Sequence, residues 1–238
     1  MQLPTFQNVE LYQDGAVIDE MVAASKNPWI AGFTTNPTLM AKAGIKDYEL
    51  FAKEVIEKIP SKPISFEVFS DDLQGMEREA KIIDAWGENI YIKVPISTTS
   101  GTSTVPLIKD LSNAGIALNI TAIFTLDQVE QTVAAISDAS KAIISVFAGR
   151  IADTGVDPVP MMKTAREILG NRTNQKLLWA SPREVLNVYQ ADQCGCDIIT
   201  ATPDILKKLS LSGKNLEEFS RETVQMFYED AENAGFKI

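Results

Sequence analysis

The sequence predicts a single (β/α)8 barrel, and two observations carry that prediction. Eight short β-rich runs alternate with helical stretches along the whole 238-residue chain. Eight strand–helix units occupy about 250 residues in barrels of this kind. In addition, no GxGxxG or GxxxxGKS/T fingerprint follows any of the runs, which disfavours the alternative of an open doubly wound sheet.

The eight expected strands are short and rich in branched and aromatic residues. They span residues 9–14, 30–36, 63–69, 90–96, 116–124, 142–148, 176–181 and 197–203. Between them apolar residues recur at helical spacing, as at Phe51, Val55 and Ile59. An amphipathic helix is expected over about 215–234. Because no linker or repeat interrupts the chain, residues 1–238 are expected to form one domain.

The composition excludes several classes of function. The net charge of −10 argues against binding to nucleic acid or to anionic membranes. The chain has no histidine, which excludes Ser-His-Asp and Cys-His catalysis and HExxH zinc sites. No run approaches the ~20 apolar residues of a membrane span. With two cysteines, expected to be reduced thiols, and no signal peptide, a cytoplasmic protein is predicted.

Polar residues near the ends of apolar strands mark the candidate site. Barrel strands are packed on both faces, and barrel active sites form at the carboxyl ends of the strands. In IYIKVPI, Ile92 and Val94 share the face that suits the helix layer, so Lys93 is expected to point into the barrel. Seven of the eight expected strands carry such a residue: Asp14, Asn36, Glu67, Lys93, Asn119 with Thr121, Ser145, and Ser181.

Lys93 is the candidate nucleophile. Desolvation in an apolar strand disfavours the charged form and leaves the neutral amine that imine formation with a ketone requires. Glu67 could hold a water that shuttles protons, or could simply pair with the lysine. Asp14 could act in the site or cap a helix beginning near Ala16. Asn36, followed by proline, has the pattern of a helix cap.

Two arginines follow expected strands six and seven, where barrels often hold a phosphate. These are Arg150 and Arg183, and Ser181 with Arg183 is expected at a helix start, which suits an anion. The sequence therefore predicts a phosphorylated substrate. A barrel that binds a sugar phosphate without catalysis, as a sensor or scaffold, is the alternative from a different class.

Seven motifs occur in order: QDGA, GFTTNPTLM, FEVF, YIKVP, NITAIF, SVFAGRI and ASPREV. Together they resemble the transaldolase family, which includes the related fructose-6-phosphate aldolases. The resemblance implies a Schiff-base lysine on the fourth strand, which the YIKVP motif puts at Lys93. It implies no metal and no organic cofactor, because the protonated imine is the electron sink.

The resemblance also implies a role for each of the other polar residues. It implies that Asp14 handles the proton of the C4 hydroxyl, and that Glu67 and Thr121 position the catalytic water. It implies that Asn36 and Asn119 hold substrate hydroxyls and that Ser145 lies near C1 of the sugar. The implied phosphate site consists of Arg150, Ser181 and Arg183.

The implied reaction is reversible transfer of a dihydroxyacetone unit from a ketose phosphate, fructose 6-phosphate or sedoheptulose 7-phosphate, to an aldose phosphate in the pentose phosphate pathway. The alternative is a lyase that releases free dihydroxyacetone. The aldolases typically carry Gln and Tyr where this chain has Glu67 and Phe147, and a tyrosine hydroxyl can orient water for imine hydrolysis. Glu67 and Phe147 therefore favour the transferase, and the wide apolar face of the final helix favours a homo-oligomer.

Overall fold

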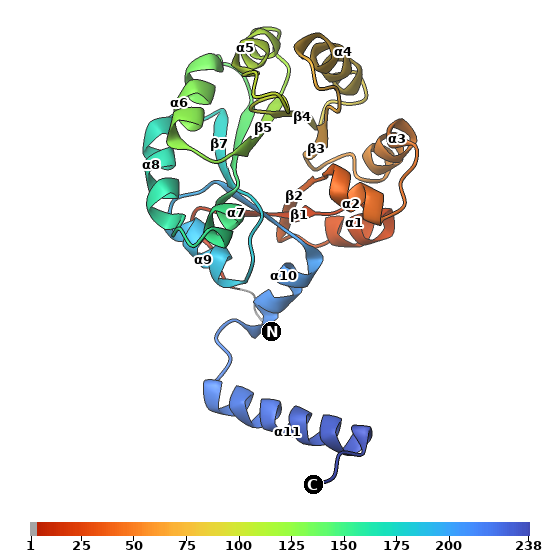
Figure 1. Cartoon of the computed structure of the whole chain (residues 1–238). Helices are drawn as coiled ribbons and strands as arrows, with labels where there is room; N and C mark the ends of the chain where they lie inside the picture. The colour runs from red at the N-terminus through yellow and green to blue at the C-terminus, as the bar shows by residue number, and fades with distance from the viewer. Residues whose placement is uncertain (1–3) are drawn as a thin grey trace. The chain divides into compact units, whose positions relative to one another are not determined.

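A computed structural model describes residues 4–238, and its central feature is a closed barrel of eight parallel strands (Figure 1). The strands follow one another around the barrel in chain order, and β1 pairs with β8. The predicted barrel is confirmed and the open sheet is wrong. The strands are β1 Glu10–Asp14, β2 Ile30–Thr34, β3 Ile64–Glu67, β4 Ile90–Pro95, β5 Leu118–Ile123, β6 Ala142–Val146, β7 Gln175–Trp179 and β8 Ile198–Ala201.

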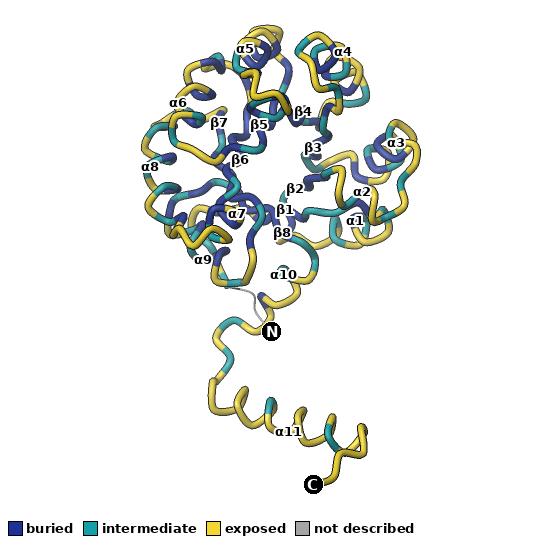
Figure 2. The backbone as a smooth tube through the Cα atoms, viewed as in Figure 1, coloured by how far each residue is buried: buried dark blue, intermediate teal, exposed yellow. Residues whose placement is uncertain are grey.

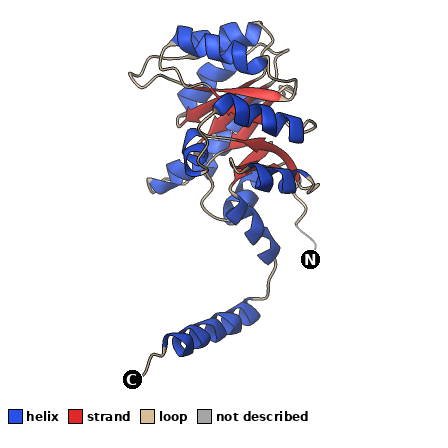
Figure 3. Ribbon diagram, turned by 90° about the vertical axis from the view of Figure 1, so that its right-hand side faces the viewer, coloured by secondary structure: helices blue, strands red, loops and turns tan. Residues whose placement is uncertain are grey.

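Helices follow every strand and surround the barrel (Figure 3). Those of the barrel are α1 Ile18–Ser25, α2 Pro37–Lys42, α3 Tyr48–Lys58, α4 Leu73–Asp84, α5 Val105–Asn113, α6 Leu126–Ala135, α7 Ala148–Asp153, α8 Val159–Leu169, α9 Leu186–Gln193 and α10 Pro203–Lys208.

The strands are buried on both faces, as their apolar sequences predict (Figure 2). The outward side chains of β4, Ile92 and Val94, are fully buried under the helices. Inside the barrel, an apolar cluster includes Tyr12 of β1, whose ring lies close to Gly32 of β2. A Cβ atom at Gly32 would lie 2.5 Å from that ring, so only glycine leaves room for the tyrosine.

The helices turn one apolar stripe toward the strands. In α4 this stripe is Met76, Ala80 and Ile83, all buried, while the opposite face is charged. The Asp72 carboxylate caps the helix by accepting a hydrogen bond from the Gly75 amide at 2.8 Å. The Asp72 cap thereby fixes where α4 begins after β3.

The described chain divides into two compact units, residues 6–206, which contain the barrel, and residues 207–238 with residues 4–5. The second unit contains a short 3-10 helix, η1 Leu209–Leu211, and the long helix α11 Leu216–Ala234. Helix α11 occupies the region, about 215–234, in which the sequence predicts an amphipathic helix. Asn215 caps α11, accepting hydrogen bonds from the Glu217 and Glu218 amides. Among the described helices, none is long and apolar enough to span a membrane.

Candidate active site

A cavity of about 440 Å³ opens among the carboxyl ends of the barrel strands. It is lined by polar side chains from strands on all sides of the barrel and by the loops that follow them. All eleven residues that the sequence singled out line this one cavity: Asp14, Asn36, Glu67, Lys93, Asn119, Thr121, Ser145, Phe147, Arg150, Ser181 and Arg183.

Lys93 lies in β4 with its side chain inside the barrel, as strand alternation predicts. Only 6% of the residue is exposed. Its Nζ lies 3.1 Å from Glu67 Oε2 and donates a hydrogen bond of 2.8 Å to the carbonyl oxygen of Thr35. Strand register produces this arrangement, because Lys93 pairs with Glu67 of β3 on one side and with Asn119 of β5 on the other.

Asp14 is the last residue of β1 and belongs to the cavity. Helix α1 begins at Ile18, so the alternative of Asp14 as its cap is wrong. The carboxylate instead accepts hydrogen bonds from Thr34 Oγ1 at 2.8 Å and Asn36 Nδ2 at 3.1 Å. Burial raises the pKa of Asp14, against the charge of Lys93 and the two hydrogen bonds, which favour the ionised form.

Asn36 has two functions in the structure. It caps α2, accepting a hydrogen bond from the Leu39 amide at 3.0 Å, with Pro37 in the first turn as the sequence predicts. Since its oxygen is occupied by the cap, its amide nitrogen is oriented toward Asp14, to which it donates. The start of α2 therefore fixes which end of the Asn36 amide faces the cavity.

A buried row of hydrogen bonds joins β3, β5 and β6 inside the barrel. Ser145 of β6 donates to Asn119 Oδ1 at 2.6 Å, and Asn119 Nδ2 donates to Ser65 Oγ at 2.9 Å. Beside this row, Thr121 is followed by Ala122, which has a positive φ of 59° where the β5–β6 register shifts. Such bulges redirect side chains next to active sites. Thr121 is thereby held at the cavity wall.

The two arginines lie at one side of the cavity. The Arg150 guanidinium lies 5.3 Å from the centroid of the Phe147 ring. Arg183 forms an ion pair with Asp153 of α7, and its hydrogen bonds lower the pKa of that carboxyl. The expected helix start at residues 181–183 is wrong, because α9 begins at Leu186. It is the side chains here, rather than a helix end, that can bind an anion.

One glycine holds the two arginine-bearing segments together. Gly149 of α7 precedes Arg150 and donates its amide to the Ala180 carbonyl at 3.2 Å. A Cβ atom at this position would lie 1.6 Å from the carbonyl oxygen of Ser181, so no other residue fits without a shift. Ser181 itself has a positive φ of 62°, a sparsely populated conformation at a site wall.

Comparison with known proteins identifies the family of this chain. Residues 11–238 match the family model described as "Transaldolase/Fructose-6-phosphate aldolase". The chain belongs to this family. It is therefore an enzyme, a transferase of the aldolase type, as the sequence predicts.

Relatives of the family match over nearly the full chain, and each is named "Probable transaldolase". The Carboxydothermus hydrogenoformans protein is 35% identical over 84% of this chain and 90% of its own length. The Thermoanaerobacter protein is 34% identical and the Nitrosopumilus maritimus protein 32%, each over 97% of this chain and 100% of its own length.

Solved structures of low identity share the fold alone. KGPDC from Streptococcus mutans has a TM-score of 0.52 at 14% identity and covers 82% of this chain and 87% of its own. Dihydrodipicolinate synthase from Rhodopseudomonas palustris has a TM-score of 0.50 at 14% identity and covers 97% of this chain and 82% of its own.

In this transaldolase-family barrel the structure adds residues that sequence reasoning did not single out. Thr34 and Thr200 line the cavity and are hydrogen-bonded to each other. Tyr48 of α3 accepts from the Glu67 amide at 2.7 Å and donates to the Glu67 carbonyl at 3.0 Å. In the sequence, Thr34 is the first threonine of TTN and Thr200 is the polar residue of IITA. Both are weak signals of a site, because threonine is ordinary in strands.

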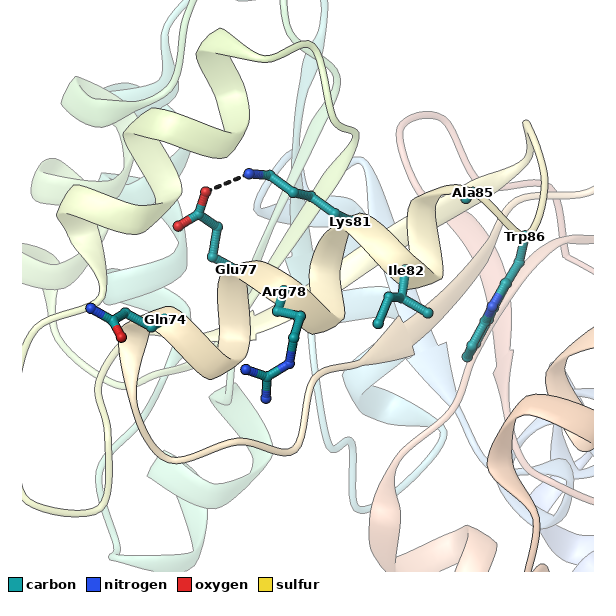
Figure 4. A pocket seen from close by; sticks show the side chains of 7 residues that line it. All are labelled: Gln74, Glu77, Arg78, Lys81, Ile82, Ala85 and Trp86. Carbon is teal, nitrogen blue, oxygen red and sulfur yellow. Dashed lines mark hydrogen bonds and ion pairs between the residues drawn. The ribbon is translucent and has the colours of Figure 1, made fainter.

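A second hollow, of about 750 Å³, lies along the outer face of α4 (Figure 4). Its lining comes from one helix and Trp86, and the side chains of Glu77 and Lys81 pair with each other at 2.5 Å. Polar groups from several strands do not converge there, in contrast to the barrel cavity. Within residues 4–238, no group of three or more Cys, Asp or Glu side chains is arranged to hold a metal ion.

Proposed function

We propose that this family member is a transaldolase. It transfers a dihydroxyacetone unit from a ketose phosphate, fructose 6-phosphate or sedoheptulose 7-phosphate, to an aldose phosphate through a Schiff base on Lys93. The observation that carries the proposal is the pair of buried Lys93 and partly buried Glu67, 3.1 Å apart in a cavity that also contains two arginines. A lysine side chain enclosed in this way is suited to nucleophilic attack on a carbonyl.

The first step joins the substrate to the enzyme. The neutral Lys93 amine attacks the ketose C2 carbonyl, and the resulting carbinolamine loses water to give the protonated imine. Glu67, within reach of Nζ, takes up the lysine proton and returns it to the departing hydroxyl through a bound water held with Thr121. The row of Asn119 and Ser145 offers hydrogen bonds to the substrate hydroxyls near C1.

Cleavage then divides the sugar. Asp14 accepts the proton of the C4 hydroxyl, the C3–C4 bond breaks, and its electron pair moves to the imine nitrogen, which leaves an enamine on Lys93. Burial, which raises the pKa of Asp14, makes its carboxylate a better acceptor of the hydroxyl proton. The acceptor aldehyde then reverses the same steps. Arg150, Arg183 and Ser181 bind the phosphate at the cavity wall.

The fate of the enamine separates transferase from lyase. Around the cavity, Phe147 presents a ring against Arg150 and Phe124, where a tyrosine would add a hydroxyl. Without that hydroxyl, water is less well oriented for hydrolysis of the dihydroxyacetone imine. The enamine therefore lasts until an aldose phosphate arrives.

We also infer a homo-oligomer for this cytoplasmic, pentose phosphate pathway enzyme. Helix α11 carries exposed apolar side chains, among them Leu216, Val224, Phe227 and Tyr228. An apolar stripe of this size on a globular protein is typical of a surface that meets another copy.

Reductive trapping tests the core of the proposal. Incubation with fructose 6-phosphate and borohydride is expected to add the reduced sugar fragment to the peptide that contains Lys93, as seen by mass spectrometry. The Lys93→Met variant is the control. An unmodified Lys93 during turnover would refute the Schiff base. If the wild type turns over no ketose and Lys93→Met still binds the sugar phosphate, the barrel that binds without catalysis, as a sensor or scaffold, would be favoured.

Omission of the acceptor tests transferase against lyase. We expect slow release of dihydroxyacetone from fructose 6-phosphate alone and a strong dependence of turnover on erythrose 4-phosphate. Phe147→Tyr is expected to raise the acceptor-free release. Rapid release by the wild type, without acceptor, would make the enzyme a lyase.

A further inference from the structure

The eighth strand also contributes a side chain to the cavity. Thr200 of β8 lies on the same face as Ile198, which belongs to the cluster inside the barrel. It is 6% exposed and lines the cavity. Its Oγ1 lies 2.6 Å from Thr34 Oγ1, which in turn lies 2.8 Å from Asp14 Oδ1.

The directions of these two hydrogen bonds follow from the chemistry of the groups. An ionised carboxylate only accepts, so Thr34 must donate its hydrogen to Asp14. A hydroxyl has one hydrogen, so Thr34 cannot also donate to Thr200, and Thr200 must donate to Thr34. When Asp14 is protonated at Oδ1, both bonds can reverse. The two hydroxyls thus form a chain whose direction follows the protonation state of the carboxyl.

We propose that Thr200 is a positioning residue for proton transfer at Asp14: when Asp14 is ionised, Thr200 donates to Thr34, which strengthens the hydrogen bond from Thr34 to the carboxylate and so favours the proton-accepting state. The inference rests on the proposed role of Asp14. Atoms balance as before, because the proton that Asp14 takes from one C4 hydroxyl returns to the hydroxyl formed with the acceptor. Thr200 itself does not touch the reacting atoms.

Other groups act on the same carboxylate. From β4 the charge of Lys93 favours ionisation, and from β3 the charge of Glu67 opposes it. From the β2–α2 segment, Asn36 donates to Oδ2. Thr200 acts from the remaining side, through β8, and a chain of hydrogen bonds polarises each of its members.

The test is the pH dependence of kcat/KM for wild type, Thr200→Val and Thr200→Ser. Valine keeps the shape and removes the hydroxyl, so the acid limb is expected to move upward by about 0.5 pH unit, a roughly threefold loss of activity on that limb. Serine restores the hydroxyl and should restore the limb. Thr202→Val is the matched control, because among the described residues its hydroxyl has no hydrogen bond to Thr34 or Asp14, and its limb should stay in place.

Borohydride trapping at Lys93 accompanies every variant. Trapping in all of them with an unmoved limb in Thr200→Val would refute the role of Thr200 and leave the transaldolase proposal standing. The same conclusion follows if Thr200→Ser behaves like Thr200→Val, or if Thr200→Val loses activity equally at every pH. Absence of trapping in the wild type would overturn the proposed function and this inference with it. If Thr200→Val does not fold, Thr200→Ala provides the same comparison.

Discussion

The Lys93–Glu67 pair makes a quantitative prediction about stability. The two side chains are 8% and 17% exposed, and Glu67→Gln keeps the volume of the glutamate while it removes the charge. Lys93 then retains the Thr35 carbonyl as its acceptor but has lost its counter-charge. Removal of one partner of a buried pair costs about 3 kcal/mol. Since 1 kcal/mol corresponds to roughly 2–4 °C in a chain of this size, Tm is expected to fall by about 6–12 °C.

The chain offers a matched control on its surface. Lys53 and Glu49 form the same type of pair at 2.5 Å, but their side chains are 57% and 56% exposed. Glu49→Gln should cost no more than about 0.5 kcal/mol, which is a shift of less than roughly 2 °C. The double variant Glu67→Gln/Lys93→Met, which removes both charges, should recover much of the loss.

Differential scanning calorimetry at pH 7 measures all four proteins. Equal shifts for Glu67→Gln and Glu49→Gln would show that burial of the Lys93 charge has no effect on stability. A double variant no more stable than Glu67→Gln alone would show that the loss comes from something other than an uncompensated lysine. Either result would refute the reasoning.

Three further predictions follow from the site. Gly149→Ala, whose Cβ would meet the Ser181 carbonyl, should cost about 2 kcal/mol and 4–8 °C in Tm and should raise KM for ketose phosphates; an unchanged KM would refute the link to the arginine segments. Burial raises the pKa of Asp14, so the free energy of unfolding of the wild type falls as the pH rises through the pKa of the folded state. Urea unfolding should therefore show Asp14→Asn becoming more stable relative to the wild type as the pH rises, and a pH-independent difference between the two would contradict this. Tyr48→Phe leaves the Glu67 amide and carbonyl without their hydrogen-bond partner, so the free energy of unfolding should fall by about 2 kcal/mol. In steady-state assays kcat should fall, and KM should change less than kcat.

The fold was predictable because a parallel barrel imposes its pattern on every strand. All eight expected strands occur, but most extend too far: residues 63–69 were expected where β3 ends at Glu67, and Phe69 is half exposed. The chain turns away from the sheet after the last paired residue, and the hydrophobic pattern alone does not show where pairing ends. The inward position of Lys93 was predictable because a side-chain period of two leaves one choice once Ile92 and Val94 face the helices.

The site was predictable only where a residue breaks its local pattern. A lysine, a glutamate and an asparagine are conspicuous in apolar strands, and all of them line the cavity. Threonine is not conspicuous there, because its branched side chain favours strands in any case, so the sequence does not mark Thr34 and Thr200 as site residues. The alternative of Asp14 as a helix cap is wrong because α1 starts at Ile18, and the length of a loop cannot be derived from one Asp-Gly pair.

The apolar cluster inside the barrel has a consequence for the order of events. Leu178 and Ala180 belong both to that cluster and to the cavity lining, so the apolar interior of the barrel continues directly from the cavity. In the proposed transaldolase reaction, the aldose released from the donor and the incoming acceptor would both occupy this cavity. Because the proposed enamine stays on Lys93 between the two sugars, they would bind in turn, and an excess of either one would compete with the other for the cavity.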